Sequence, residues 1–428
     1  MQLVRESVDK AVWSERTNYS ESIYNVSVNA NGKWAIFNSA SGAVAIIDSD
    51  IVTNVSIEEK MCLVENGFLV PYATQEYDRY IAKVNISDKE KPDFFTIIPT
   101  TVCNAQCFYC YEEDYCKQTV DDDALDRIIN YLSQHLDDNA ECVLDWYGGE
   151  PLLCVNQIDR IVSTLIERGK LIDRWSSSIT TNGTLLSKNI IAHLVRDWRL
   201  ATAHITIDGT EKDHNLRKNV ALNGESAFRK TFSGIYELLS AGVYVNLRIH
   251  LDHLNKASFP DILQELSVLF QFEKLHLFPT FLFPPEHDMP ENYIKDSEKE
   301  DLFYGVFKSL LASNYKADLR DMFPYPRRRG CFATKPNTLV IAPDGGIHAC
   351  VQDFNTSDMT DNCKYSDFRY ALEACKECAY LPICLGGCLY NRNLNSTVRT
   401  PCVRNRYIIK PLLKLLLEHS ANLTEIST

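Results

Sequence analysis

The sequence predicts an α/β protein whose main domain is a partial (β/α)6 barrel of the TIM-like type. A small α+β module is predicted before the barrel and a cysteine-rich domain after it. Short β-rich runs broken by Asn-Gly and Ser-Gly turn signals occupy the first part of the chain, as in "SIYNVSVNANGKWAIFNSASGAVAIID". Strand and helix patterns then alternate, and eight of the 15 cysteines lie between Cys331 and Cys402. The expected boundaries are 1–90 for the module, 91–280 for the barrel, 281–330 for a connector and 331–428 for the cysteine-rich domain.

The first module contains one predicted helix. The stretch "SIEEKMCLVENGFLVP" predicts a short helix that ends at Asn66-Gly67 and is followed by a strand. The size of the module and its β-then-helix order predict a winged-helix-like domain, which can bind a peptide as an added edge strand. The alternative is a structural cap on the barrel.

Six segments in the barrel region have the pattern of buried strands: "FFTIIPT", "CVLDWYGG", "SSSITTNG", "AHITIDG", "VYVNLRIHL" and "KLHLFPT". Helical patterns lie between them, such as "DDDALDRIINYLSQHL", "NQIDRIVSTLIERG" and "ASFPDILQELSVLF". Strands joined by helices pair in parallel, so their carboxyl ends share one edge, where barrels of this kind place their active sites. Most of the polar motifs in this region fall at those ends.

Composition excludes several classes of protein. The 428 residues are 45% hydrophobic and 24% charged, enough for a large core and more than one domain. A net charge of -13 argues against a nucleic-acid partner. The first residues lack the apolar run of a signal peptide, and no stretch approaches the roughly 18 apolar residues that span a bilayer. We therefore expect a soluble, cytoplasmic protein with no membrane partner, whose cysteines are reduced rather than paired as disulfides.

Three cysteines follow the first predicted strand, in "PTTVCNAQCFYCYEEDY". The spacing of Cys103, Cys107 and Cys110 matches neither two CxxC pairs of a zinc site nor an even set of disulfides. It suits a cubane iron–sulfur cluster in which the protein holds three irons and leaves the fourth open. Tyr109 is predicted to place an aromatic face beside the cluster and Phe108 to pack inward. Cys116, six residues after Cys110, is the rival candidate for a fourth ligand.

The second strand ends in "YGGEP", which contains Gly148, Gly149 and Glu150. Paired glycines leave backbone groups open to close approach, and a carboxylate beside them can receive an ammonium group. Alone, this motif is typical of a turn. At the same barrel edge as the three cysteines, it predicts a ligand contact.

These two motifs together resemble the radical S-adenosylmethionine (SAM) enzymes, and "TTNGTLL", "TIDGTEKDHNLRK" and "NLRIHLDHLN" resemble later strands of the same family. The resemblance implies that a [4Fe-4S] cluster binds SAM and that reductive cleavage of SAM gives a radical that abstracts hydrogen. It further implies that Thr180 and Asn182 bind the cofactor near its ribose. Arg217 would approach its carboxylate, with Lys218 as the rival because the register is one residue short. Arg248 either faces this site or is merely packed.

The C-terminal cysteines narrow the resemblance to the SPASM domain, which binds two auxiliary [4Fe-4S] clusters, making three clusters in all. The resemblance implies that three cysteines hold the inner auxiliary cluster: Cys331, Cys350 and Cys388. It implies that four hold the outer one: Cys375, Cys378, Cys384 and Cys402. The fourth iron of the inner auxiliary cluster either has no protein ligand or is bound by Cys363.

SPASM proteins include peptide maturases, sulfatase-activating enzymes and a few small-molecule enzymes. Sulfatase-activating enzymes carry a catalytic aspartate directly after the second cysteine of the series, where this chain has Val351. Asp353, two residues later, is the candidate catalytic residue of this chain. The sequence favours a maturase that crosslinks a ribosomally made precursor peptide through a thioether, C–C or C–O bond, with flavodoxin or ferredoxin as the reducing partner. Sulfatase-type and small-molecule radical chemistry remain alternatives. An alternative of another class is an iron–sulfur electron carrier or sensor. Such a protein would not need the GGEP and TNG loops, so these motifs argue against it.

Overall fold

The computed structural model describes residues 1–14, 16–48, 55–84, 93–113, 115–136, 141–220, 222, 224–282, 293–334, 338–354, 373, 375–393 and 402–420. The chain forms two compact units, each assembled from separate segments. The first unit comprises Met1–Ile86, Lys295–Cys331 and Asp367–Thr428, and the second comprises Ser87–Ile294 and Phe332–Ser366. The linear domain boundaries expected from the sequence stay a prediction.

The second unit contains an eight-stranded sheet in the order β12-β11-β10-β9-β8-β7-β13-β14. Its six main strands run parallel in chain order: β7 (Phe94–Thr100), β8 (Cys142–Gly148), β9 (Trp175–Thr181), β10 (Leu200–Ile207), β11 (Tyr244–Leu251) and β12 (Leu275–Phe281). β13 (Thr338–Ile341) lies parallel to β7, and β14 (Ile347–His348) pairs with β13 in the antiparallel direction. The predicted α/β fold with parallel strands is confirmed.

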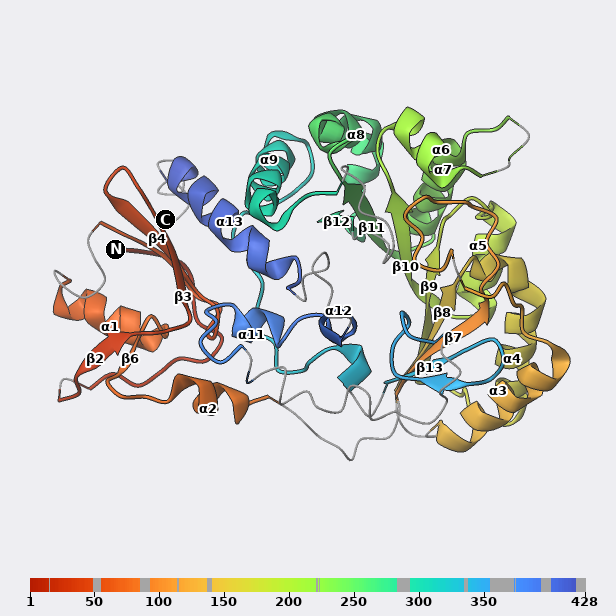
Figure 1. Cartoon of the computed structure of the whole chain (residues 1–428), viewed down its shortest axis with the longest axis horizontal. Coiled ribbons are helices and arrows are strands. Elements are labelled where there is room, and N and C mark those ends of the chain that lie inside the picture. Colours follow the sequence, from red (N-terminus) through yellow and green to blue (C-terminus); the bar gives the residue numbers. More distant parts are fainter. Residues whose placement is uncertain are drawn as a thin grey trace. The chain divides into compact units, whose positions relative to one another are not determined.

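Helices alternate with these strands and cover one face of the sheet (Figure 1). They are α3 (Asp122–His135), α4 (Val155–Glu167), α5 (Lys188–Asp197), α6 (Glu211–Lys218), α7 (Ala227–Ser240) and α8 (Phe259–Leu266). Short 3-10 turns are η1 (Pro151–Cys154), η2 (Lys256–Ser258), η3 (Ser267–Gln271) and η5 (Phe332–Thr334). The helix predicted over 257–270 is therefore interrupted, with α8 between two 3-10 turns.

The two faces of the sheet differ in polarity because successive side chains of a strand point to opposite sides. On β11, Val245, Leu247 and Ile249 are fully buried on the face that α7 packs against. Asn246 and Arg248 lie on the other face, where Arg248 is exposed. The face without helices is thus the polar, inner face of the partial barrel.

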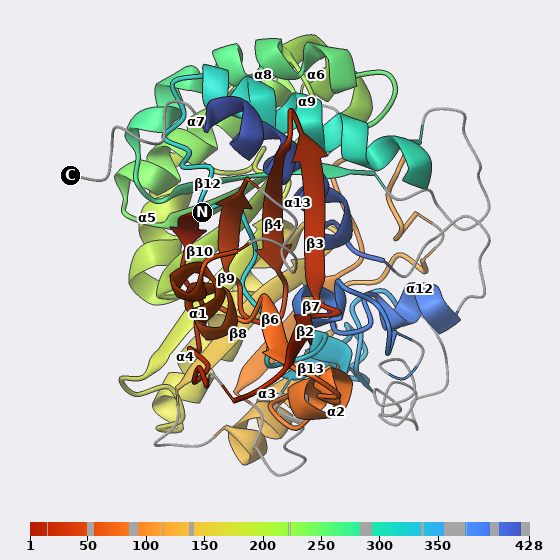
Figure 2. The ribbon, with the colours of Figure 1, turned by 90° about the vertical axis from the view of Figure 1, so that its left-hand side faces the viewer.

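The first unit contains a four-stranded antiparallel sheet in the order β1-β5-β4-β3, in which β3 and β4 lie side by side (Figure 2). Its strands are β1 (Gln2–Arg5), β3 (Asn25–Ala30), β4 (Lys33–Asn38) and β5 (Val44–Ile47). A second pair consists of β2 (Tyr19–Glu21) and β6 (Leu69–Pro71), and the helices are α1 (Ile57–Glu65) and α2 (Glu76–Ile81). Ser56 and Glu59 form a capping box at the start of α1, which ends at Asn66 as predicted. The winged-helix class of this module stays a prediction.

C-terminal helices complete the core of the first unit. They are α9 (Lys299–Ala312) after η4 (Asp296–Glu298), α11 (Leu381–Cys384), α12 (Leu389–Asn393) and α13 (Asn405–His419). The apolar side of α13 packs against α9, β3 and β4. The N-terminal strands and the C-terminal helix therefore share one core. In the described part of the chain, none of the helices combines the length and the apolar character needed to cross a bilayer.

Candidate active site

The loop after β7 brings the three predicted cysteines of the first motif together. All three are half-buried, and the N–H of Cys110 donates to the carbonyl of Cys107 at 3.0 Å. The N–H of Ala105 points at the Cys103 sulfur from 3.4 Å. Burial raises the pKa of Cys110 to about 11, and the charges of Cys107 and Cys103 add to this shift. The three thiols are thus close enough to act on one another.

The glycines of the GGEP motif are required by backbone contact with this loop. Gly148 has φ +111, and a Cβ there would lie 2.4 Å from the carbonyl oxygen of Thr100. A Cβ on Gly149 would lie 2.3 Å from the carbonyl oxygen of Val102. The N–H groups of Gly149 and Glu150 donate to these two carbonyls, both at 3.0 Å. The loop after β8 therefore fixes the start of the cysteine loop, and any larger residue would separate them.

Glu150 connects the loops that follow β8 and β9. Its side chain is fully buried, and one carboxylate oxygen accepts from the Thr181 hydroxyl at 2.8 Å and from the Leu152 N–H at 3.1 Å. The other oxygen accepts from the N–H of Asn182 at 2.9 Å. The predicted role for Glu150 was to receive an ammonium group of a ligand; in the structure it holds three donors of the protein.

Asn182 continues this connection to the cysteines. Its amide nitrogen donates to Asn104 at 2.7 Å and lies 3.7 Å from the Cys103 sulfur, while its amide oxygen accepts from Thr184. Thr180, two residues earlier on β9, is half-buried beside His204 of β10. Asn104 and Thr184 were not predicted, since neither stands out by residue type alone.

Lys218 places a buried cation against Tyr109 of the cysteine loop. Its ammonium lies 3.2 Å from a carboxylate oxygen of Asp208 and donates to the Tyr109 hydroxyl at 3.1 Å, and the side chain is only 6% exposed. Burial raises the pKa values of Cys103 and Cys107, while the charge of Lys218 lowers both. Tyr109 thus lies beside the cysteines, with its hydroxyl bound to Asp208 and Lys218.

Arg217 points elsewhere. Its Nη2 donates to both carboxylate oxygens of Asp252, at 2.7 and 2.8 Å. The guanidinium also lies over the ring of Phe108, at 5.5 Å from the centroid. The expectation that Phe108 packs inward was wrong: the ring is 41% exposed, because Tyr109 takes the inward place beside Asp208. Arg217 and Lys218 thus contact neighbouring residues of the cysteine loop, Phe108 and Tyr109, and which of them approaches the carboxylate of SAM stays a prediction.

Residues 97–266, which contain these motifs, match the family model of the radical SAM superfamily. The chain carries a radical SAM domain. Over 335 residues it is 22% identical to a cysteine-type anaerobic sulfatase-maturating enzyme of Clostridium novyi, covering 68% of this chain and 86% of that one. It is 25% identical over 260 residues to an uncharacterised protein of Methanocaldococcus jannaschii, covering 59% of this chain and 82% of the relative.

Two solved structures share the fold. One is anSMEcpe with bound AdoMet and the Cp18Cys peptide, with a TM-score of 0.57 and 16% identity over 78% of this chain and 99% of that one. The other is Streptococcus suis SuiB bound to S-adenosylmethionine, with a TM-score of 0.51 and 15% identity over 90% of this chain and 99% of that one.

Asp208 is the centre of a buried polar network in the radical SAM domain. Its carboxylate accepts from the Tyr109 hydroxyl at 2.7 Å and lies 3.2 Å from Nδ1 of His250, and its N–H donates to Nδ1 of His214 at 3.2 Å. Burial alone would raise the pKa of Asp208, but Lys218 and His250 hold it below its ordinary value. Asp208 is therefore ionised and compensated at neutral pH.

This network predicts a pH dependence of stability. Burial lowers the pKa of His214 from 6.5 to about 4, against the charge of Asp208, so only the unfolded chain binds this proton between those values. The stabilisation is complete above pH 6.5 and is lost as the pH falls toward 4. We expect His214 to account for a decrease of about 2 kcal/mol in the free energy of unfolding between pH 7 and pH 5. Urea unfolding of wild type and His214→Asn at several pH values measures the difference, and parallel pH curves would contradict it.

The predicted auxiliary ligand Cys350 lies in a turn of the second unit. The N–H of Gln352 points at its sulfur from 3.4 Å, and the N–H of Asp353 donates to its carbonyl at 3.1 Å. The Tyr115 hydroxyl donates to the Gln352 carbonyl at 2.9 Å, which ties this turn to the cysteine loop. The same turn therefore holds Asp353, the candidate catalytic residue, close to Cys350 through this backbone hydrogen bond.

The four cysteines of the predicted outer set all belong to the first unit. Burial raises the pKa of Cys384 to about 11, and the charges of Cys402, Cys375 and Cys378 add to it, so the four lie near one another. The Arg406 guanidinium lies 3.4 Å from the Cys402 sulfur. Thiolate sets of this kind suit iron–sulfur clusters.

The predicted inner set is divided by the unit boundary. Cys331 and Cys388 belong to the first unit and Cys350 to the second, while Cys363 lies outside the described residues. Among the described side chains, no three His, Cys, Asp or Glu residues converge on a point where one metal ion would sit. Single-ion sites hold their sulfur ligands at about 2.3 Å, whereas the cysteines of a cubane bind different irons and lie farther apart. The assignment of each cysteine to a cluster stays a prediction.

Proposed function

We propose that this protein is a radical SAM peptide maturase, which abstracts a hydrogen from a residue of a ribosomally made precursor peptide and forms a thioether, C–C or C–O crosslink. The observation that carries the proposal is the set of three thiols at the carboxyl ends of the barrel strands, with Asn182 and Lys218 against them. The solved structure of SuiB bound to its precursor peptide SuiA, with a TM-score of 0.50 and 14% identity, supports a peptide as the substrate.

The thiols of Cys103, Cys107 and Cys110 fit a cluster with one open iron. When bound, this cluster and SAM supply one-electron chemistry that generates a hydrogen-abstracting radical. Asn182 orients the edge of the loop beside Cys103, and Lys218 supplies a buried positive charge that favours deprotonated, cluster-binding thiols. The GGEP loop keeps the cysteine loop in place through its backbone hydrogen bonds.

Two further clusters and a protein reductant belong to the proposal. The outer set Cys375, Cys378, Cys384 and Cys402 and the inner set Cys331, Cys350 and Cys388 are proposed to hold one auxiliary [4Fe-4S] cluster each. The mutual influence of the outer four on the pKa of Cys384 supports the first of these assignments. Flavodoxin or ferredoxin is the proposed source of electrons.

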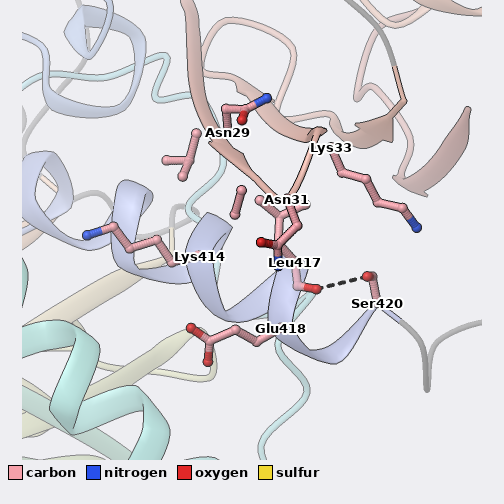
Figure 3. A pocket seen from close by; sticks show the side chains of 9 residues that line it. Asn29, Asn31, Lys33, Lys414, Leu417, Glu418 and Ser420 are labelled. Atoms are coloured by element: carbon pink, nitrogen blue, oxygen red, sulfur yellow. Dashed lines mark hydrogen bonds between the residues drawn. The ribbon is translucent and has the colours of Figure 1, made fainter.

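The N-terminal module is proposed to hold the leader part of the peptide. Within the described residues β3 is the terminal strand of its sheet, which offers an edge for an added strand. Beside it lies a pocket of about 430 Å³ between the β3–β4 turn and the end of α13 (Figure 3). Asn29, Asn31 and Lys33 come from the hairpin and Leu417 and Ser420 from the helix side.

A sulfatase-maturating reaction is the second candidate, favoured by the Clostridium novyi relative. Such a reaction would oxidise a side chain of a protein substrate to an aldehyde. Val351 stands where the resemblance places the catalytic aspartate of those enzymes, so Asp353 would have to replace it. This departure makes the maturase the better-supported proposal.

Mass spectrometry separates the two. The anaerobically reconstituted, reduced protein is incubated with SAM and with short peptides encoded beside its gene. A crosslink removes two hydrogen atoms and leaves the product unreactive to hydrazide, whereas oxidation to an aldehyde gives a hydrazide-reactive product. We expect the first result together with formation of 5′-deoxyadenosine. A hydrazide-reactive product would favour the sulfatase-type reaction, and no modification of any such peptide would contradict both.

A further inference from the structure

One cation on the inner face of the barrel is not used by the site described above. Arg248 lies on β11 in register with Thr206 of β10 and Phe278 of β12, and its side chain is exposed. Within the described part of the chain, it forms no hydrogen bond or ion pair, whereas Arg217 is bound to Asp252 and Lys218 to Asp208. Arg248 is therefore a charged group without a protein partner in that part of the structure.

The charge of Arg248 acts on titratable side chains of three other positions on the sheet: Tyr147, His204 and His250. Burial lowers the pKa values of His204 and His250, and the charge of Arg248 lowers both further. Burial raises the pKa of Tyr147, on β8, to about 12, with the charge of Arg248 opposing the shift. Tyr147 and Arg248 come from strands separated by β9 and β10, so the charge of Arg248 acts across the inner face of the sheet.

The residues around this position are suited to a polar ligand. Thr180, His204, Asn246 and His276 are neighbours in register across β9, β10, β11 and β12. Interiors of closed barrels are usually filled by branched apolar side chains, so a polar row marks a face that receives a ligand. The lowered pKa values of His204 and His250 favour the neutral form of both rings, and no described carboxylate forms an ion pair with the guanidinium of Arg248. The carboxylates of Asp145 and Asp208 act on these two histidines, and neither forms an ion pair with Arg248.

We propose that Arg248 binds a carboxylate of the peptide substrate, so that the segment entering the barrel carries an Asp or Glu side chain or a terminal carboxylate. This inference rests on the proposed function. Arginine binds carboxylates through two parallel N–H donors, a geometry that a single lysine cannot reproduce. The methionyl group of SAM also carries a carboxylate. Lys218, however, is the cation that acts on Cys103 and Cys107, while Arg248 acts on Tyr147 and His204.

The test uses two capped amino acids of equal shape, N-acetyl-glutamate amide and N-acetyl-glutamine amide. Their binding to the reconstituted full-length protein, saturated with SAM, is measured by titration calorimetry. We expect the glutamate probe to bind about tenfold more tightly than the glutamine probe, as for a charge-assisted pair. Arg248→Gln should abolish this preference and Arg248→Lys should keep part of it. Arg229→Gln, on the helix-covered side of the domain, is the matched control and should behave as wild type.

Two outcomes would overturn the inference: equal binding of both probes by the wild type, or a preference that Arg248→Gln retains. The Kd of SAM, measured for the same proteins, identifies the competing source of carboxylate. If Arg248→Gln weakens SAM binding more than tenfold and the wild type does not distinguish the probes, Arg248 binds the methionyl carboxylate instead. Cleavage of SAM without peptide is assayed in parallel. Its absence in the wild type would contradict the proposed function, independently of the result with the probes.

Discussion

Replacing Cys103, Cys107 and Cys110 together by alanine is expected to abolish reductive cleavage of SAM. Three cubanes carry about twelve irons per chain, so the triple variant should retain about eight after anaerobic reconstitution. SAM cleavage should be lost because these three thiols are the proposed protein ligands of the cluster with the open iron. Among the described residues, Cys116 is the one other cysteine on this loop. Iron content and 5′-deoxyadenosine formation are measured on the same preparations.

The control for this experiment is Cys116→Ala. Cys116 is exposed and is the rival fourth ligand near the trio. We expect this variant to keep its full iron content and cleavage rate, because an exposed thiol outside the spacing motif has no role in the cluster. Loss of about four irons in Cys116→Ala would make it a ligand. Normal cleavage by the triple variant would refute the assignment of the cofactor site.

The alternation of strands and helices in the barrel could be predicted because each element carries a local signal. Buried strands such as β10 and β11 place apolar residues at every second position, and helix α3 begins at an aspartate cap, Asp121. The ends of parallel strands must meet at one edge, so the motifs could be placed together without knowing their contacts. The helical stretch expected over 257–270 forms as α8 with a 3-10 turn at each end.

The roles of individual residues in the site could not be predicted in the same way. The sequence places Arg217 and Lys218 next to each other, and only the orientation of α6 decides that Lys218 meets Tyr109 while Arg217 meets Asp252. Likewise, the need for glycine at position 149 comes from the carbonyl of Val102, which belongs to another strand-end loop. Such contacts depend on the tertiary fold rather than on local pattern.

The organisation of the first unit was also hidden from composition. Residues 1–90 carry their own turn signals and strand patterns, yet β3 and β4 pack against α13 at the other end of the chain. Arg404, just before α13, is half-buried and lies over the rings of Phe303 and Phe307 of α9. Removing the N-terminal module would therefore expose the apolar side of α13. Peptide binding by this module is better tested with point substitutions at the β3 edge than with a truncation.

The second large effect is expected at Glu150. Its carboxylate is fully buried and accepts three hydrogen bonds, from Leu152, Thr181 and Asn182. Glu150→Ala leaves these donors without an acceptor and is expected to lower the free energy of unfolding by about 3 to 5 kcal/mol. Urea unfolding without SAM measures this loss. Because Asn182 contacts the cysteine loop, SAM binding should weaken as well.

Glu150→Gln separates this structural role from direct binding of the ligand's ammonium group. The amide has nearly the same shape, but its NH2 group must face at least one of the three protein donors. If Glu150 acts through the protein, the variant should lose about 1 to 3 kcal/mol of stability in the absence of SAM. If instead the carboxylate receives the ammonium of SAM, stability without SAM should stay unchanged and the Kd of SAM should rise about tenfold or more. The hydrogen bonds that Thr181 and Asn182 donate to Glu150 favour the loss of stability in the absence of SAM. Although glutamine has nearly the same shape as glutamate, its NH2 group cannot accept from these donors, so the junction between the β8 and β9 loops becomes weaker.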